Sequence, residues 1–179
     1  VRAAAARQQV ETSFARVKKS KIDLIQVHNM GDVPAHLAVL KEFKQQGRVR
    51  YIGVTTTFEP QYAELVNAMK TASFDFIGVD YAIDNREVER VILPLARERR
   101  IGVLAYAPFG RTRLFRRVGN RPLPDWAKEF DAQTWAQFFL KYVASHPAVT
   151  AITPATSRPA NLADNMGGAR GRLPDAAMR

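Results

Sequence analysis

Hydrophobic positions along the chain follow two spacings that alternate from one end of the sequence to the other. Val10, Phe14 and Val17 lie at i, i+4 and i+7, which predicts a helix over about residues 2–19. The next apolar run, 22–27, is interrupted by only two polar residues and predicts a short buried strand. Similar runs predict four more strands, at residues 49–54, 74–79, 101–106 and 149–152.

Helix signals fill the segments between these strands. Pro34 opens a helix that we expect to end near Gly47, and Pro60 lies in the first turn of another. Residues 85–100 are expected to form one helix, in which Pro94 introduces a kink or lies on a solvated turn. The inward-facing residues of this helix are predicted to be Val88, Val91, Ile92, Leu95 and Ala96.

The last third of the sequence combines a long irregular segment with two further helices. Residues 107–133 are predicted to be a long loop, because they contain Gly110, Gly119, Pro122 and Pro124. A helix is expected over 134–145, and another after Ser157. The helix over 134–145 carries aromatic residues at helical spacing, which we expect in the core: Trp135, Phe138, Phe139 and Tyr142.

The alternation of strands and helices predicts an α/β fold with a parallel sheet and right-handed connections. A (β/α)8 barrel and a doubly wound sheet both fit this pattern. The barrel is favoured because no Gly-x-Gly-x-x-Gly follows the first strand. It is also favoured because polar or aromatic residues recur at successive strand ends, where barrels hold their active sites. These residues are His28, Thr55, Thr56, Tyr81, Tyr106 and Thr153.

Chain length sets a limit on this barrel. A complete barrel has eight strands and about 250 residues, whereas this sequence has 179 residues and predicts five strands. We therefore expect a single incomplete barrel domain over residues 1–179, a partial (β/α)8 TIM barrel. About three strands of the barrel are expected to lie outside this sequence.

Composition excludes several kinds of site. No run of about 18 apolar residues is present, so no transmembrane helix and no membrane partner are expected. The absence of cysteine excludes disulfides, thiolate metal sites and cysteine nucleophiles. The histidines, His28, His36 and His146, lie far apart in the sequence, so we do not expect a metal site.

The chain is strongly basic, with 27 Lys and Arg against 17 Asp and Glu and a formal charge of +10. A nucleic-acid partner is one interpretation of such a charge. The arginines are spread along predicted helices, however, and no nucleic-acid motif accompanies them. We therefore expect a small anionic ligand rather than nucleic acid, and rank a surface for anionic polymers last.

Four motifs occur in the same order as in a known family. They are residues 22–28, 47–54, 101–110 and 153–158, the last continuing to Asn165. Together they resemble the aldo/keto reductases, over the part of that barrel from its fourth to its eighth strand. The resemblance implies an oxidoreductase that reduces aldehydes and ketones to alcohols with NADPH, by hydride transfer to the carbonyl carbon and protonation of its oxygen.

The resemblance also implies a catalytic tetrad of Asp, Tyr, Lys and His. His28 matches the histidine, which orients the substrate carbonyl. The other three lie on the first three strands of the family's barrel, so we expect them upstream of Val1 and expect this chain alone to be inactive. The alternative is a non-catalytic NADP-binding or regulatory member or fragment that lacks the Asp, Tyr and Lys.

The cofactor-binding residues implied by the resemblance fall into two groups. Tyr106 matches the aromatic residue that stacks on the nicotinamide ring. Thr55 and Thr56 occupy the positions of a Ser-Asn pair that contacts the nicotinamide carboxamide. Gly78 falls where the family usually has a glutamine for the same carboxamide, which is a departure from the family pattern. Thr156, Ser157, Arg158 and Asn165 match the clamp for the adenosine phosphate.

The residues of this clamp suit a phosphate on physical grounds as well. Ser157 is predicted to cap the last helix, whose N-terminus favours phosphate oxygens. Arg158 offers a planar guanidinium to a 2′-phosphate, which favours NADP over NAD. Asn165 lies two turns further along the same helical face. The sequence leaves open the substrate, the oligomeric state and the compartment; a cytoplasmic protein is the default, and an exported one would need an N-terminal signal.

Overall fold

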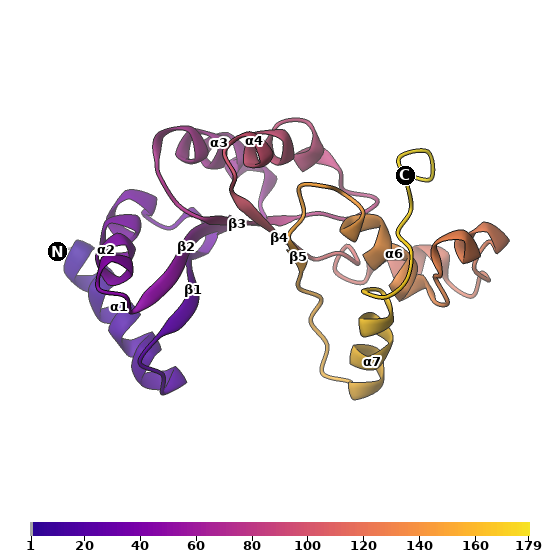
Figure 1. The fold of residues 1–179 in the computed structure, drawn as a ribbon, viewed down its shortest axis with the longest axis horizontal. Helices are drawn as coiled ribbons and strands as arrows, with labels where there is room; N and C mark the ends of the chain where they lie inside the picture. Colours follow the sequence, from indigo (N-terminus) through magenta and orange to yellow (C-terminus); the bar gives the residue numbers. More distant parts are fainter. Residues whose placement is uncertain (1) are drawn as a thin grey trace. The chain divides into compact units, whose positions relative to one another are not determined.

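A computed structural model describes residues 2–179 of the protein. Its strands are β1 (Ile22–Val27), β2 (Val49–Thr56), β3 (Phe76–Asp80), β4 (Gly102–Tyr106) and β5 (Ala151–Ile152). They form one sheet in the order β1-β2-β3-β4-β5, and helices alternate with them along the chain (Figure 1). The α/β class and the parallel strands of a partial barrel are therefore confirmed. Contacts group the residues into two compact units: residues up to Gly78 with Leu95–Gly102, and Val79–Pro94 with Val103–Arg179.

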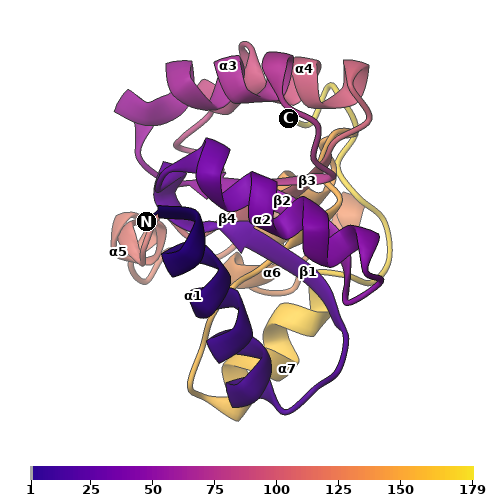
Figure 2. The same ribbon diagram turned by 90° about the vertical axis from the view of Figure 1, so that its left-hand side faces the viewer.

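In the first unit, helices α1 (Arg2–Val17) and α2 (Val33–Gln45) lie side by side over β1 and β2 (Figure 2). The rings of Phe14 and Phe43 stack with their centroids 5.8 Å apart. Arg48 lies over both rings, at 4.4 and 4.8 Å from their centroids, and donates to both carboxylate oxygens of Glu11. This stack joins α1 to α2 and to the start of β2. The unit also contains α3 (Tyr62–Thr71).

The second unit has an aromatic core, as the spacing over 134–145 predicts, although Trp135 is only half-buried and packs against the edge of this core. Helix α6 (Trp135–Ala144) buries Phe138, Phe139 and Tyr142, with 7%, 3% and 3% of their surface exposed. Phe130 packs on Phe138 with ring centroids 5.4 Å apart. Helix α7 (Pro159–Gly167) packs on α6 and completes the unit.

The single helix predicted over 85–100 is wrong. The chain forms a short 3-10 turn, η3 (Glu87–Glu89), and then α4 (Ile92–Glu98). A proline inside a helix lacks an N–H donor and clashes with the carbonyl four residues earlier. Starting α4 at Ile92 places Pro94 in the first turn, where neither penalty arises. Val91, predicted to face inward, lies between the two helical segments and is 51% exposed.

The segment predicted as a long loop, 107–133, is partly helical. It contains α5 (Arg113–Val118) and a 3-10 segment, η4 (Asp125–Phe130). Both are six residues long, too short to show a helical period in the sequence. The strand predicted at 149–152 is also shorter than expected. Thr150 Oγ1 accepts the Val103 N–H at 3.0 Å, so a side chain takes this donor and β5 begins at Ala151.

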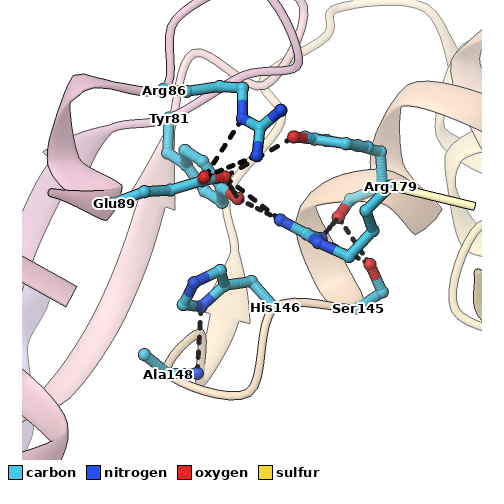
Figure 3. A network of polar contacts seen from close by, with 8 residues as sticks. Tyr81, Arg86, Glu89, Ser145, His146, Ala148 and Arg179 are labelled. Carbon is cyan, nitrogen blue, oxygen red and sulfur yellow. Dashed lines mark hydrogen bonds and ion pairs between the residues drawn. The ribbon is translucent and has the colours of Figure 1, made fainter. Parts of the chain in front are cut away.

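A polar network holds Arg179 in the second unit (Figure 3). Glu89 accepts from the Tyr81 hydroxyl at 2.5 Å and from Arg179 at 3.1 Å, and Arg86 donates to its other oxygen at 2.7 and 3.0 Å. Arg179 also donates to Ser145 Oγ at 2.6 Å. Because burial raises the pKa of Tyr81, its hydroxyl stays protonated and acts as a donor to Glu89.

Two backbone carbonyls in the segment after α7 depend on one buried lysine. Lys141 on α6 is completely buried, and its Nζ donates to the carbonyl of Arg170 and, at 2.8 Å, to that of Arg172. Arg172 in turn donates to both carboxylate oxygens of Asp131, at 2.8 and 3.1 Å. Lys141 therefore joins α6 to the 170–172 segment by hydrogen bonds.

We expect Lys141→Met to lower the free energy of unfolding by about 1–3 kcal/mol, because two carbonyls lose their donor. Urea denaturation of the 179-residue chain measures this change. Lys128→Met is the matched control: Lys128 is exposed, its side chain at 82%, so its replacement should change stability by less than about 0.5 kcal/mol. Unchanged or increased stability of Lys141→Met would show that the buried charge opposes folding more than its hydrogen bonds favour it.

Candidate active site and cofactor cleft

His28 lies directly after β1, as the sequence predicts, and it is exposed. The chain turns sharply there, because Asn29 adopts a left-handed conformation with φ 50° and ψ 43°. Thr55, at the carboxyl end of β2, is 5% exposed and holds this turn. Its Oγ1 accepts the Asn29 N–H at 3.3 Å and donates to the Val27 carbonyl at 3.4 Å.

Thr56 contacts the same turn indirectly, through Gln61. It is completely buried, and its hydroxyl donates to Gln61 Oε1 at 2.6 Å and accepts the Phe58 N–H at 3.1 Å. Gln61 then donates to the Asn29 carbonyl at 3.3 Å. The predicted pair therefore divides: Thr55 contacts the turn that carries His28, and Thr56 acts on that turn through Gln61.

Tyr106 is the last residue of β4 and is half-buried, which raises the pKa of its phenol. Its carbonyl accepts the Tyr81 N–H at 3.1 Å, so Asp80 and Tyr106 end neighbouring strands side by side. Alternate side chains of a strand point to opposite faces. Tyr81, expected at the site, is completely buried on the other face, in the network of Figure 3, and Asp80 takes its place beside Tyr106.

A cleft of about 830 Å³ gathers the residues predicted to form the phosphate clamp. Thr156, Ser157, Arg158 and Asn165 all line it. The prediction that Ser157 caps the last helix is wrong: the N-cap of α7 is Arg158, whose backbone is extended. Thr156 Oγ1 accepts the Arg158 N–H at 3.1 Å, which turns the chain so that Pro159 takes the first helical position.

A network that the sequence analysis missed positions α7 and Asn165. Asp164 accepts from the Thr134 hydroxyl at 2.9 and 3.0 Å and from Gln137 at 2.8 Å. Thr134 also caps α6 by accepting the Gln137 N–H at 3.2 Å. The neighbouring Asn165 is 9% exposed. The sequence signal for this network is Thr134-x-x-Gln137, a spacing typical of a capped helix start.

Part of the cleft lining comes from the segment that was predicted to be a loop. This segment contributes Phe109, Thr112 and Phe115. Arg113 fixes the segment by a bidentate ion pair with Asp84, at 2.7 and 3.0 Å. Gly110 has a φ of +55°, which favours glycine, and a Cβ there would meet the Arg113 guanidinium at 2.9 Å.

Residues 2–179 contain neither a membrane-spanning helix nor a cluster of metal ligands. No helix within residues 2–179 has the length and apolar character needed to cross a bilayer. Across the same part of the chain, no three His, Asp or Glu side chains come together as metal ligands.

Comparison with solved structures shows the fold. An aldo-keto reductase from Bacillus halodurans matches 99% of this chain and 65% of its own, with a TM-score of 0.79 and 21% identity. One from Klebsiella pneumoniae, solved in complex with NADPH, matches 93% of this chain and 59% of its own, with a TM-score of 0.71 and 24% identity. Both proteins are barrels, and this chain covers about three fifths of the length of each.

Sequence comparison identifies the family. A Saccharomyces cerevisiae protein assigned as an aryl-alcohol dehydrogenase is 34% identical over 113 residues, which cover 60% of this chain and 33% of that protein. The chain thus spans about a third of the length of this relative. The model of the aldo/keto reductase family matches residues 1–179. On this match, the chain belongs to the aldo/keto reductase family.

Proposed function

We propose that the complete protein reduces aldehydes or ketones to alcohols with NADPH, and that this chain supplies cofactor-binding residues and the catalytic His28. The observation that carries the proposal is the cleft in which Thr156, Ser157, Arg158 and Asn165 converge. The NADPH complex of the Klebsiella pneumoniae protein supports the choice of cofactor. The activity is proposed for the complete protein because this chain spans only part of its relatives.

The chemistry of the cleft fits an adenosine phosphate. Thr156 and Ser157 offer hydroxyls, and Arg158 offers an exposed guanidinium with paired donors for phosphate oxygens. The first N–H groups of a helix lack intrahelical partners and favour anions, and α7 starts at this cleft. Asn165 presents an amide, which can donate and accept, to the same cleft.

His28 and Tyr106 have separate roles in the proposal. The exposed imidazole of His28 donates a hydrogen bond to the substrate carbonyl oxygen and orients it. Tyr106 provides a flat ring for the nicotinamide, and bound NADPH supplies the hydride. Thr55 contacts the carboxamide side of the cofactor, whereas the Thr56 hydroxyl, bonded to Gln61, supports the turn that carries His28.

Arg158→Ala should weaken the binding of NADPH about tenfold to a hundredfold and change that of NADH little. The reason is that one charge-assisted contact with the 2′-phosphate is lost, worth about 1.5–3 kcal/mol. Titration calorimetry of the 179-residue chain with both nucleotides measures the effect. Arg158→Lys keeps the charge but loses the planar pair of donors. Its affinity for NADPH should therefore lie between that of the unaltered chain and that of Arg158→Ala.

Arg170→Ala is the matched control for charge alone, because Arg170 is an exposed arginine just beyond α7 and does not line the cleft. Its affinity for NADPH should stay close to that of the unaltered chain. Equal weakening of NADPH and NADH by Arg158→Ala would contradict the 2′-phosphate role.

The 179-residue chain alone should bind NADPH but not reduce carbonyls. Hydride transfer builds negative charge on the carbonyl oxygen, and general acid catalysis there is worth roughly 10²–10⁴-fold. We expect the acid tyrosine and its lysine partner to lie outside residues 1–179. The measurement is NADPH oxidation with a panel of reactive aldehydes. Turnover of about one per second, an ordinary enzymatic rate, would show that the acid lies within this chain.

This experiment also separates the proposal from the non-catalytic alternative. Joining the upstream sequence of the gene to this chain should restore turnover if the complete protein is an enzyme. Binding without turnover in the complete protein would instead favour an NADP-binding or regulatory member.

A further inference from the structure

We propose that Asp80 accepts a hydrogen bond from the nicotinamide carboxamide, and so takes the place of the glutamine that the family usually has where this chain has Gly78. The inference rests on the proposed function, since it assumes that Tyr106 carries the nicotinamide. It adds a cofactor-positioning residue that the family pattern does not predict.

The strands place Asp80 beside the nicotinamide platform. The Tyr81 N–H donates to the Tyr106 carbonyl at 3.1 Å, so the carboxyl ends of β3 and β4 lie side by side. Val79 and Tyr81 are completely buried on one face of β3, as are Val103 and Ala105 on β4. Asp80 and Tyr106 are half-buried and belong to the other face. Asp80 and Tyr106 are therefore neighbours on the same face.

One carboxylate oxygen of Asp80 lacks a partner. Its Oδ1 is buried and accepts no hydrogen bond from any residue in the described part of the chain, 2–179. The other oxygen, Oδ2, lies 3.8 Å from Arg111 Nη2, and the Asp80 side chain is only 15% exposed. A buried acceptor without a donor is costly. Burial raises the pKa of this carboxyl, and the nearby Arg111 and Arg113 guanidiniums and the Asn85 side chain offset only part of that rise. The site is thus short of one hydrogen-bond donor.

The carboxamide supplies the donor that is lacking. Its NH2 group has two N–H donors, and its oxygen is an acceptor. Gly78 has no side chain with which to accept from this group. Asp80 lies two residues further along β3, on the same face of the strand, and ends it beside Tyr106. A carboxylate only accepts, so Asp80 would select for the amide NH2 itself, whereas a glutamine can use either end of its amide.

The 3-acetylpyridine analogue of NADP⁺ tests this contact directly. It keeps the 2′-phosphate, the adenine and the carbonyl, and replaces the NH2 by a methyl group. The unaltered 179-residue chain should bind NADP⁺ about tenfold to a hundredfold more tightly than the analogue, measured by titration calorimetry. In Asp80→Ala this ratio should fall to about one, because NADP⁺ binding weakens while analogue binding does not.

Two further variants control the experiment. Asp80→Asn keeps an acceptor oxygen but loses the charge, so its ratio should be intermediate; it also serves if Asp80→Ala does not fold. Glu89→Gln changes another largely buried carboxylate, 19% exposed, that is bonded to Tyr81 and Arg179 and does not line the cleft. Its ratio should match that of the unaltered chain.

The outcomes distinguish this inference from the proposed function. Binding of the analogue and of NADP⁺ with equal affinity by the unaltered chain would overturn the role of Asp80 and leave the cleft intact. So would a ratio that neither Asp80 variant changes. If the unaltered chain binds neither nucleotide, the proposed cleft fails, and the role of Asp80 fails with it.

Discussion

Parallel strand pairing is the constraint on which the rest of this structure depends. A chain that pairs its strands in parallel must leave each strand through a turn and return through a crossover. The last residue of each strand and the first of its turn are therefore where backbone pairing ends and side chains become available for chemistry. His28, the first residue after β1, and Tyr106, the last residue of β4, occupy such positions, and Thr55 lies one residue before the end of β2. The turns are held by specific hydrogen bonds, as the Thr55, Thr56 and Gln61 contacts with Asn29 show.

The sequence could predict those elements whose apolar or aromatic residues recur at a regular spacing. The strands were predictable because apolar runs bounded by turn residues recur, and the aromatic face of α6 was predictable because its spacing is helical over about two turns. Pro94 was a visible signal whose effect was misjudged: it ends up in the first turn of α4 rather than inside a longer helix. Helix α5 could not be predicted, because six residues do not display a period.

The candidate site was predictable by residue type, but not by the hydrogen bonds that orient it. Thr156, Ser157, Arg158 and Asn165 do line one cleft. The contacts that shape this cleft join residues far apart in the sequence, such as Thr134 with Asp164 and Arg113 with Asp84. Such pairs leave no local pattern. The N-cap of α7 could not be predicted either. Thr156 Oγ1 accepts the Arg158 N–H, and the helix begins after Arg158 rather than after Ser157.

Two largely buried charged groups of the second unit, Lys141 and Asp80, show how a polar group inside a protein can be structural or functional. Lys141 is completely buried and donates to the carbonyls of Arg170 and Arg172. Its hydrogen bonds are made within the chain, so folding alone accounts for it. Asp80 differs, because its buried Oδ1 has no donor within residues 2–179, although Arg111 lies near its other oxygen. Folding leaves that acceptor unsatisfied, which disfavours the unliganded chain and favours any ligand with an N–H at this point. Because Asp80 lies next to Tyr106, the NH2 group of the cofactor carboxamide is the donor that we propose for Oδ1.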